Sequence, residues 1–295
     1  ATTHALVYPT THPRHFTHTH TFISFYKYMN ITCCLCIRNC AYYLPKIFNN
    51  LDILANQFNN LSIIFVYDNC TDSSEKLLQE FKSSRSYNIF ILHNVNNNSH
   101  YRTIRIANAR NMAIDFIYNV IPNTDFHFMI DADDVNSDTW NIDIINKYLN
   151  TNDWDCISFN RPRYYDMWAL LYGDYKQHCW GFKNNSVKVI EYLKADVINK
   201  LDNLKDDELF ECISAFNGFA IYRTNVFKNI KYNGSYSNFK TLITDKEREI
   251  TLAILNKHIG NNIFIDDGHI DVCEHLSYHI NATKINNARI RISKY

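Results

Sequence analysis

The sequence lacks a long uninterrupted apolar run. No window reaches the roughly 18 consecutive apolar residues that a membrane-spanning helix needs. The N-terminal residues also lack the charged-then-apolar pattern of a secretory signal. We therefore expect no membrane span in this chain.

The sequence also lacks an excess of charge of either sign. Lys plus Arg and Asp plus Glu both total 30, so the formal net charge is zero. A chain without net charge produces no global field that would steer it toward nucleic acid or an anionic membrane. We expect no nucleic-acid partner.

Glycine and proline are scarce, at 6 and 5 residues, and a second CxxC motif is missing. The nine cysteines are an odd number in a chain too long to need disulfide staples, and several lie inside apolar runs. Cys33 and Cys36 have CxxC spacing, which also suggests zinc or redox chemistry, but they fall in a predicted strand. Small core residues with reduced thiols are the favoured interpretation.

What the sequence does contain is enough apolar material for a core: 46% of 295 residues. Residues 1–27 are rich in His and Thr without apolar periodicity and are predicted to form an arm. No linker or internal repeat interrupts residues 28–295, which we expect to form a single domain.

From Tyr28 onward, apolar β-branched stretches alternate with segments of helical period. This alternation predicts a parallel sheet with right-handed crossovers. The second half is less regular, with helices predicted near 186–195 and 245–258. The predicted strands of the first half are 30–37, 61–67, 88–94 and 126–130, and its predicted helices are 41–58, 71–84 and 103–121.

Three carboxylates, Asp131, Asp133 and Asp134, follow the fourth predicted strand directly. Ligands of such sheets bind beyond the carboxyl ends of the strands. Clustered carboxylates there form a hard-oxygen site for Mg²⁺ or Mn²⁺ with open positions for phosphate oxygens. The alternative is a solvated turn in which Asp133 or Asp134 caps a following helix.

Two further groups of polar residues lie near the same edge. Asp68 and Asn69 end the second strand, where a carboxylate accepts a base N–H or a ribose hydroxyl; ordinary turn chemistry is the alternative. Arg102, Arg105 and Arg110 open the third helix. They are placed to contact a pyrophosphate, to pair with the acidic cluster, or to form a solvated basic face.

Together, a strand ending in CIRN, a second ending in YDNCTD, an Arg/Asn-rich helix and the motif MIDADD resemble nucleotide-sugar glycosyltransferases of the GT-A fold. The resemblance is to the family 2-like enzymes and to relatives in capsule-forming organisms and giant DNA viruses. It covers residues 28–140 well and thins to short motifs beyond them.

The resemblance implies an α/β fold: a GT-A, Rossmann-like, mostly parallel central sheet flanked by helices. Residues 28–140 would bind the nucleotide sugar, and the irregular residues 141–295 the acceptor. The implied activity is metal-dependent transfer of a hexosyl or pentosyl group from a nucleoside-diphosphate sugar, expected to be a UDP-sugar, to a hydroxyl of a glycan or glycoprotein. The reduced thiols favour a cytosol-like compartment, so we expect a cytoplasmic location, or the host cytoplasm or virion for a viral chain.

The resemblance also implies roles for single residues. Asp133 becomes the main ligand of Mn²⁺ or Mg²⁺, Asp131 a ribose or metal contact, and Asp68 the nucleobase contact. YDNCTD departs from the usual acidic-glycine-serine turn at the last of these. The expected donor contacts are Arg38, Asp68, Asn69, Arg105, Arg110, Asp131, Ala132 and Asp133.

The segment DVCEHLSYH looks like the acidic-plus-histidine segment of related enzymes. There Glu274 would serve as the base for the acceptor hydroxyl if the anomeric centre inverts, and His279 would complete the metal shell. A retaining reaction needs no dedicated base. The alternative is a surface pair of Glu274 with His275 and a core position for His279.

Asp245 is the second expectation for the base, because it matches the place of the acidic motif in many family 2-like enzymes. Thr244 or Asp245 is also a natural N-cap for the following helix. On the acceptor side, FNGFAIYRTNVF resembles a lining segment in which Gly218 permits close approach of backbone or sugar.

Aromatic residues gather between Tyr164 and Trp180. Of these, Trp168, Tyr172 and Trp180 are placed in the sequence either to stack on sugar rings or to fill a core.

Two other classes of protein compete with this interpretation. FMIDADDV also fits the Asp-X-Asp nucleophile of a haloacid-dehalogenase-like phosphatase, although that nucleophile usually follows the first strand of the core. A catalytically silent sugar-binding module on the same fold is the second alternative.

Overall fold

A computed structural model describes residues 28–95, 99–161, 163–260 and 262–295. The predicted arm, residues 1–27, lies outside the described residues. The strands are β1 (Asn30–Ile37), β2 (Asn60–Tyr67), β3 (Asn88–His93), β4 (Phe126–Asp131), β5 (Cys156–Phe159), β6 (Leu209–Cys212), β7 (Phe219–Arg223) and β8 (Ile290–Ser293). The helices are α1 (Leu44–Gln57), α2 (Ser74–Ser83), α3 (Arg102–Val120), α4 (Ile142–Leu149), α5 (Ser186–Asp202), α6 (Tyr236–Leu242), α7 (Asp245–Ile259) and α8 (Glu274–Asn286), with 3₁₀ turns η2 (Asp134–Asn136) and η3 (Thr224–Phe227).

Across the described residues, the strands form one sheet in the order β3-β2-β1-β4-β7-β5-β8-β6. The first four strands pair in parallel, as do β5 and β8, whereas β7 runs antiparallel to both of its neighbours and β6 antiparallel to β8. The mostly parallel α/β fold expected from the sequence is therefore confirmed. The chain moves outward from β1 to β3 and then returns to place β4 on the other side of β1. This reversal puts the switch point between β1 and β4.

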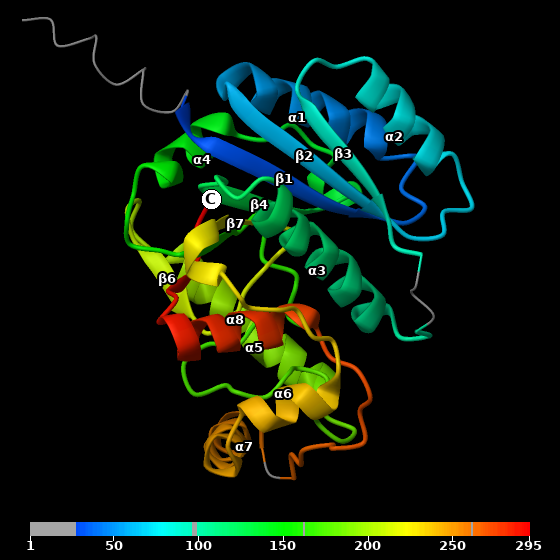
Figure 1. Ribbon diagram of the computed structural model, residues 1–295. Coiled ribbons are helices and arrows are strands. Elements are labelled where there is room, and N and C mark those ends of the chain that lie inside the picture. Colours follow the sequence, from blue (N-terminus) through cyan, green and yellow to red (C-terminus); the bar gives the residue numbers. More distant parts are fainter. Residues whose placement is uncertain (1–27, 96–98, 162, 261) are drawn as a thin grey trace, which may run out of the picture.

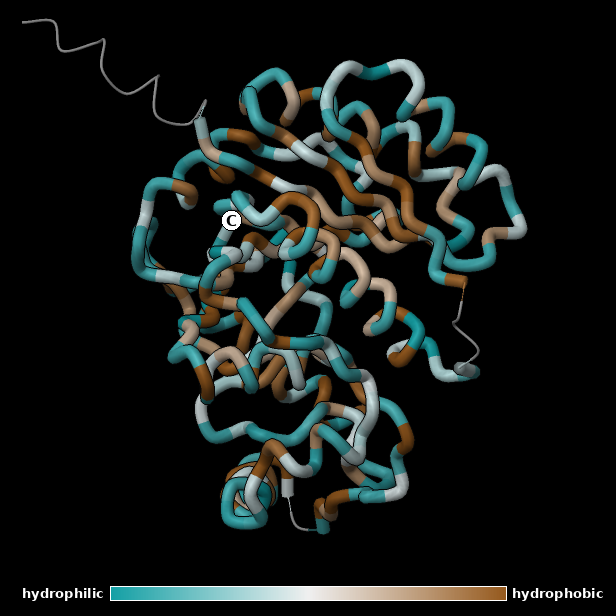
Figure 2. The backbone as a smooth tube through the Cα atoms, viewed as in Figure 1, coloured by the Kyte–Doolittle hydropathy of each residue, from teal (hydrophilic) through white to brown (hydrophobic). Residues whose placement is uncertain are grey.

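Helices cover both faces of the sheet. In Figure 1, α1 and α2 lie on one face and α3 on the other. Because side chains alternate along a strand, neighbouring β1 residues enter different cores: Cys33 packs with α1, and Cys34 with α3. In Figure 2, much of the backbone of the central strands is brown, the colour of hydrophobic residues. Both thiols are fully buried, and all nine cysteines are unpaired, as the sequence predicted.

The second half of the chain adds α5 to α8 on the α3 side and four short strands at the far side of the sheet (Figure 1). The loop before β5 is tied to the loop before β8, because the Asp155 carboxylate accepts hydrogen bonds from Arg289 Nε at 2.9 Å and Nη2 at 3.1 Å. Among the described helices, none is both long and apolar enough to cross a membrane.

Helix α7 begins with a complete capping box. Thr244 Oγ1 accepts a hydrogen bond from Glu247 N at 3.3 Å, and the Glu247 carboxylate accepts one from Thr244 N at 2.8 Å. Two backbone donors at the helix start are thereby satisfied. Asp245, in the first turn, leaves its side chain 95% exposed.

The Thr244→Ala variant removes this cap. We expect it to lower the free energy of unfolding by about 1 kcal/mol, the usual cost of losing a threonine N-cap. Urea denaturation measures the change. Thr241→Ala is the matched control, since exposed Thr241 only bonds back to a carbonyl of its own helix. Equal losses in the two variants would contradict the assignment.

Candidate functional site

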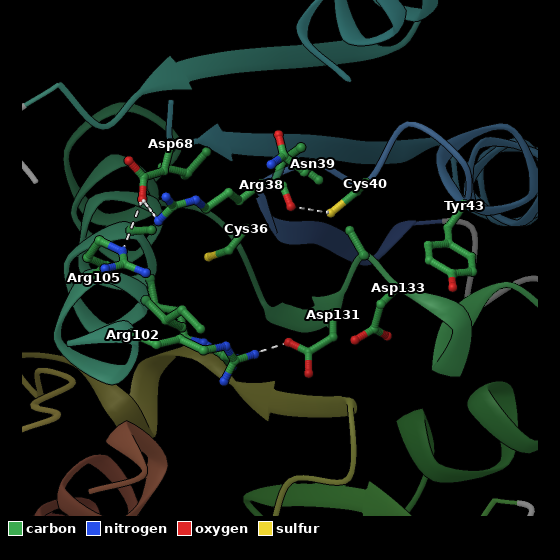
Figure 3. A pocket seen from close by; sticks show the side chains of 16 residues that line it. Cys36, Arg38, Asn39, Cys40, Tyr43, Asp68, Arg102, Arg105, Asp131 and Asp133 are labelled. Atoms are coloured by element: carbon green, nitrogen blue, oxygen red, sulfur yellow. Dashed lines mark hydrogen bonds and ion pairs between the residues drawn. The ribbon is translucent and has the colours of Figure 1, made fainter. Parts of the chain in front are cut away.

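A cavity of about 290 Å³ opens at the carboxyl edge of the sheet, where β1, β2 and β4 end. The loops after these strands and the first turns of α3 form its walls (Figure 3). It therefore lies at the switch point between β1 and β4, where open α/β sheets bind their ligands.

One side of the cavity is acidic. Asp131 ends β4, and its backbone N–H donates to Gly218 O at 2.8 Å; Asp133 lies two residues further. Both line the cavity, and Figure 3 shows them side by side. Burial raises the pKa of Asp131, and burial together with the Asp131 carboxylate raises the pKa of Asp133 to about 6. Negative charge is thus concentrated at this point.

Asp133 also caps the 3₁₀ turn that follows it, because its Oδ1 accepts from Val135 N at 3.2 Å. The capping alternative drawn from the sequence therefore holds for one oxygen of Asp133, while the side chain still borders the cavity. Asp134, by contrast, is exposed and outside the lining.

The other side of the cavity combines a carboxylate with arginines. Asp68 Oδ2 lies 3.5 Å from Arg38 Nη1 and 3.7 Å from Arg105 Nε, and Figure 3 shows this group across the cavity from Asp131. Arg102, the first residue of α3, borders the same space. Asn69 is exposed in the turn after β2 with a left-handed φ of 38°, and it does not line the cavity.

Arg110 occupies the floor between two carboxylates. Its side chain is 4% exposed; Nη2 donates to Asp131 Oδ1 at 2.9 Å, and Nε lies 3.1 Å from Glu274 Oε1. The guanidinium also stacks 4.6 Å from the centre of the Phe216 ring and contacts His275 Nε2. Although burial opposes its charge, the two carboxylates raise the pKa of Arg110 well above its ordinary value. Of the arrangements expected from the sequence, Arg110 adopts the pairing with the acidic cluster.

Glu274 is the first residue of α8 and is buried, at 4% exposure. Its carboxylate also lies 3.8 Å from His275 Nε2, so the expected Glu–His pair exists but is buried.

His279 lies one turn further along α8, in the core. Ser214 Oγ and Tyr222 Oη each lie 3.0 Å from one of its ring nitrogens, and burial lowers its pKa to about 3. Both nitrogens are therefore engaged within the protein. The expected role of His279 as a metal ligand does not fit this placement, because the core alternative is the one that the structure adopts.

Asp245 also stands apart from the cavity, exposed at the start of α7 beside Arg248. Its capping-box neighbour explains the position, so the expected role of Asp245 as the base does not fit its placement either.

The aromatic segment divides between core and surface. Tyr172 is 4% exposed and donates its hydroxyl to Asp196 at 2.8 Å, so it belongs to the core. Trp168 is partly buried against the same core, whereas Trp180 remains 46% exposed.

Several residues at the site escaped the sequence analysis. Cys36, Cys40 and Tyr43 line the cavity, and burial together with the charge of Asp131 raises the pKa of Asp166 to about 7. The position of Cys40 and Tyr43 just after β1 was a usable signal, because strand ends build such sites. Asp166 had none, since it lies in an irregular stretch.

Two carboxylates are the donor set available for a divalent metal. In the parts of the chain that the structure describes, no group of three or more His, Cys, Asp or Glu side chains is arranged to hold a metal. Mg²⁺ sites in proteins often use only one or two carboxylates and take their remaining ligands from substrate phosphates and water. Asp131 and Asp133, crowded and partly buried, fit that kind of site.

Comparison with solved structures gives distant similarities. The chain aligns with TarS from S. aureus at 13% identity and a TM-score of 0.42, and the alignment covers 90% of this chain and 58% of that one. It aligns with mannosyltransferase PcManGT from Pyrobaculum calidifontis, solved with GDP-Man and Mn²⁺, at 13% identity and a TM-score of 0.40, and this alignment covers 76% of this chain and 52% of that one. The alignment with glucosyl-3-phosphoglycerate synthase from Mycobacterium tuberculosis, solved with UDP, has 11% identity and a TM-score of 0.41, and it covers 78% of this chain and 66% of that one.

The chain thus spans little more than half the length of the first two structures. No curated protein sequence matches it significantly. The family model described as "Glycosyl transferase family 2", however, matches residues 32–231. This match covers more than half of the chain and includes β2, β4 and most of β1, the strands that end at the cavity, so the protein belongs to glycosyl transferase family 2.

Proposed function

We propose that the protein is a metal-dependent glycosyltransferase. It would move a hexosyl or pentosyl group from a nucleoside-diphosphate sugar, with a UDP-sugar as the expected donor, to a hydroxyl of a glycan or glycoprotein. The observation that carries this proposal is the cavity at the switch point, in which Asp131 and Asp133 face an arginine-lined wall. The family match supports the same reaction class.

The charges of the cavity suit a diphosphate. Arg38, Arg102 and Arg105 border it, and Arg102 begins α3, whose N-terminal N–H groups also favour an anion. Asp68 orients two of these arginines through its ion pairs and is the proposed contact for the nucleobase or ribose. The diphosphate would then lie between the arginines and the acid pair.

Asp131 and Asp133 would hold Mg²⁺ or Mn²⁺. When bound, the metal neutralises negative charge on the diphosphate leaving group. A cation would also relieve the repulsion that raises the pKa of Asp133.

Arg110 orients the Asp131 carboxylate. Because its Nη2 donates a hydrogen bond to Asp131 Oδ1, Oδ2 remains available to a ligand in the cavity. Glu274, the base expected from the family resemblance, has one oxygen beside Arg110 and is almost fully buried. This placement suits Glu274 to holding Arg110 better than to meeting an acceptor hydroxyl.

Calorimetric titration of UDP and GDP, once with Mn²⁺ and once with EDTA, tests the proposed function. We expect UDP to bind with Mn²⁺ and to lose at least about tenfold in affinity with EDTA, about 1.4 kcal/mol, because the acid pair would then repel the diphosphate. Folded protein that binds neither nucleotide would contradict the proposal. Metal-dependent binding without sugar transfer to any acceptor would favour the silent sugar-binding module.

The Asp133→Asn variant tests the metal site. The amide oxygen still accepts from Val135 N, so the turn is kept while one negative charge is lost. We expect the Mn²⁺-dependent part of UDP binding to disappear with an unchanged melting temperature. Asp138→Asn, exposed on the same segment, is the control. Retention of metal-dependent binding in the Asp133 variant would exclude Asp133 as a ligand.

The Arg110→Met variant tests the central pair. It leaves the buried Glu274 and the partly buried Asp131 without their cation, so we expect the free energy of unfolding to fall by about 3–5 kcal/mol. Arg85→Met removes a more exposed pair with Asp52 and should cost about 1 kcal/mol or less. Denaturant unfolding compares the two. Adding Glu274→Gln to Arg110→Met should recover part of the loss, and equal costs for both single variants would refute the central role of Arg110.

A further inference from the structure

A second cavity, of about 270 Å³, opens where the C-terminus approaches α4 and β7 (Figure 1). We call it the aromatic pocket, and the lining side chains that matter to its chemistry are Trp140, Ile144, Phe159, Arg161, Phe219 and Tyr295. None of the described residues that line it also lines the cavity at the switch point. The aromatic pocket is therefore a separate space for a ligand.

Three buried rings form the inner wall of the aromatic pocket. The Phe219 ring meets Trp140 edge-on, with ring centres 5.2 Å apart, and meets Phe159 in the same way at 5.7 Å. Trp140 Nε1 donates to Asn136 O at 3.2 Å, so the polar atom of the indole is already satisfied. What these rings present to the pocket is apolar surface, held in place by their contacts with one another. Such a surface suits an aromatic ligand ring, because aromatic rings pack edge-on or offset against one another.

The aromatic pocket also has a cation. Arg161 lines it, two residues after the end of β5, and the backbone beside Arg161 is anchored by the buried Asn160. Asn160 N donates to Ser293 O at 3.0 Å, and Asn160 Oδ1 accepts from Tyr164 N at 2.6 Å. The guanidinium is thus attached to a fixed point at the pocket.

The charge of Arg161 is not balanced locally. Of the described residues that line the aromatic pocket, none has a carboxylate side chain, and no Asp or Glu of the described chain forms an ion pair with Arg161. Arg163, two residues further, differs in this respect, since it lies 3.5 Å from Asp202. A guanidinium is a planar donor that matches a carboxylate or phosphate. The pocket therefore offers an apolar wall and an anion contact together.

We propose that the aromatic pocket is a second ligand site, which takes an aromatic ring that carries an anionic group. The ring would pack against Trp140 and Phe219, and the anionic group would pair with Arg161. Mostly apolar cavities with a few polar groups are typical of small-molecule sites. An apolar cavity of about 150 Å³ already accepts benzene, so this larger pocket has room for a ring with a substituent. The proposal does not depend on the proposed function, because no residue of the switch-point cavity takes part.

Calorimetric titration with three probes tests the proposal. Indoleacetate has a ring and a carboxylate, tryptophol has the same ring with a hydroxymethyl group in place of the carboxylate, and acetate has the charge alone. We expect indoleacetate to bind with a Kd of about 1 mM or tighter, as ordinary ligand efficiency gives for its size. Tryptophol should bind at least about tenfold more weakly, because it lacks the charge-assisted bond to Arg161. Acetate should give no binding heat.

The Arg161→Gln variant assigns the binding to the pocket. We expect it to weaken indoleacetate binding by at least about tenfold and to leave tryptophol binding unchanged. Arg163→Gln is the matched control, because Arg163 is 64% exposed and lies outside the lining. In a second variant, Ile144→Trp, a larger side chain fills the pocket and should remove the binding of both indole probes. Its melting temperature shows whether it is folded.

Two results would overturn the proposal. One is equal affinity of indoleacetate for the wild-type protein and for Arg161→Gln, which would place the probe elsewhere, such as at the arginines of the switch-point cavity. The other is a folded wild-type protein that binds none of the three probes. Neither result involves UDP, GDP or Mn²⁺, so both are distinct from failure of the proposed function.

Discussion

The buried guanidinium of Arg110 is the interaction on which the site depends. It comes from α3 in the first half of the chain, pairs with Asp131 on β4, and reaches Glu274 at the start of α8 near the other end of the sequence. Buried charges are costly unless they are paired and hydrogen-bonded. Removing Arg110 would therefore leave two carboxylates without a cation, whereas removing either carboxylate would leave Arg110 paired with the other. This requirement holds the second half of the chain against the first half.

The need to pair buried charges also explains why the carboxylates of the site have different roles. Asp131 and Glu274 are tied to Arg110, and Asp68 to the arginines of the opposite wall. Among the described residues, Asp133 forms no ion pair with a lysine or arginine, although it lines the same cavity. In the proposed enzyme, this carboxylate would face the metal. Its surroundings, rather than its residue type, distinguish it from the other three carboxylates.

The sequence was sufficient to predict the first half of the fold. Its strands and helices are long and periodic, so β1 to β4 and α1 to α3 fall within a few residues of the expected ranges. In the second half the strands have four or five residues, too short for a periodic signal. The placement of Asp131 and Asp133 at the cavity was predictable, because both follow the end of a strand. The core position of His279 was not, because it depends on Tyr222 and Ser214, which are distant in sequence.

The position of β8 has a consequence for the order of folding. This strand, Ile290–Ser293, lies between β5 and β6, and β6 is joined to the sheet through β8 alone among the described strands. During synthesis, strands β1 to β4 pair with one another, and their one further partner is β7. All of these strands are therefore available once residue 223 has emerged from the ribosome. The far side of the sheet must wait for residues 290–293. Contacts between such distant segments form slowly because a long loop must close first. A ribosome-bound chain would thus carry a folded first half beside an open sheet edge.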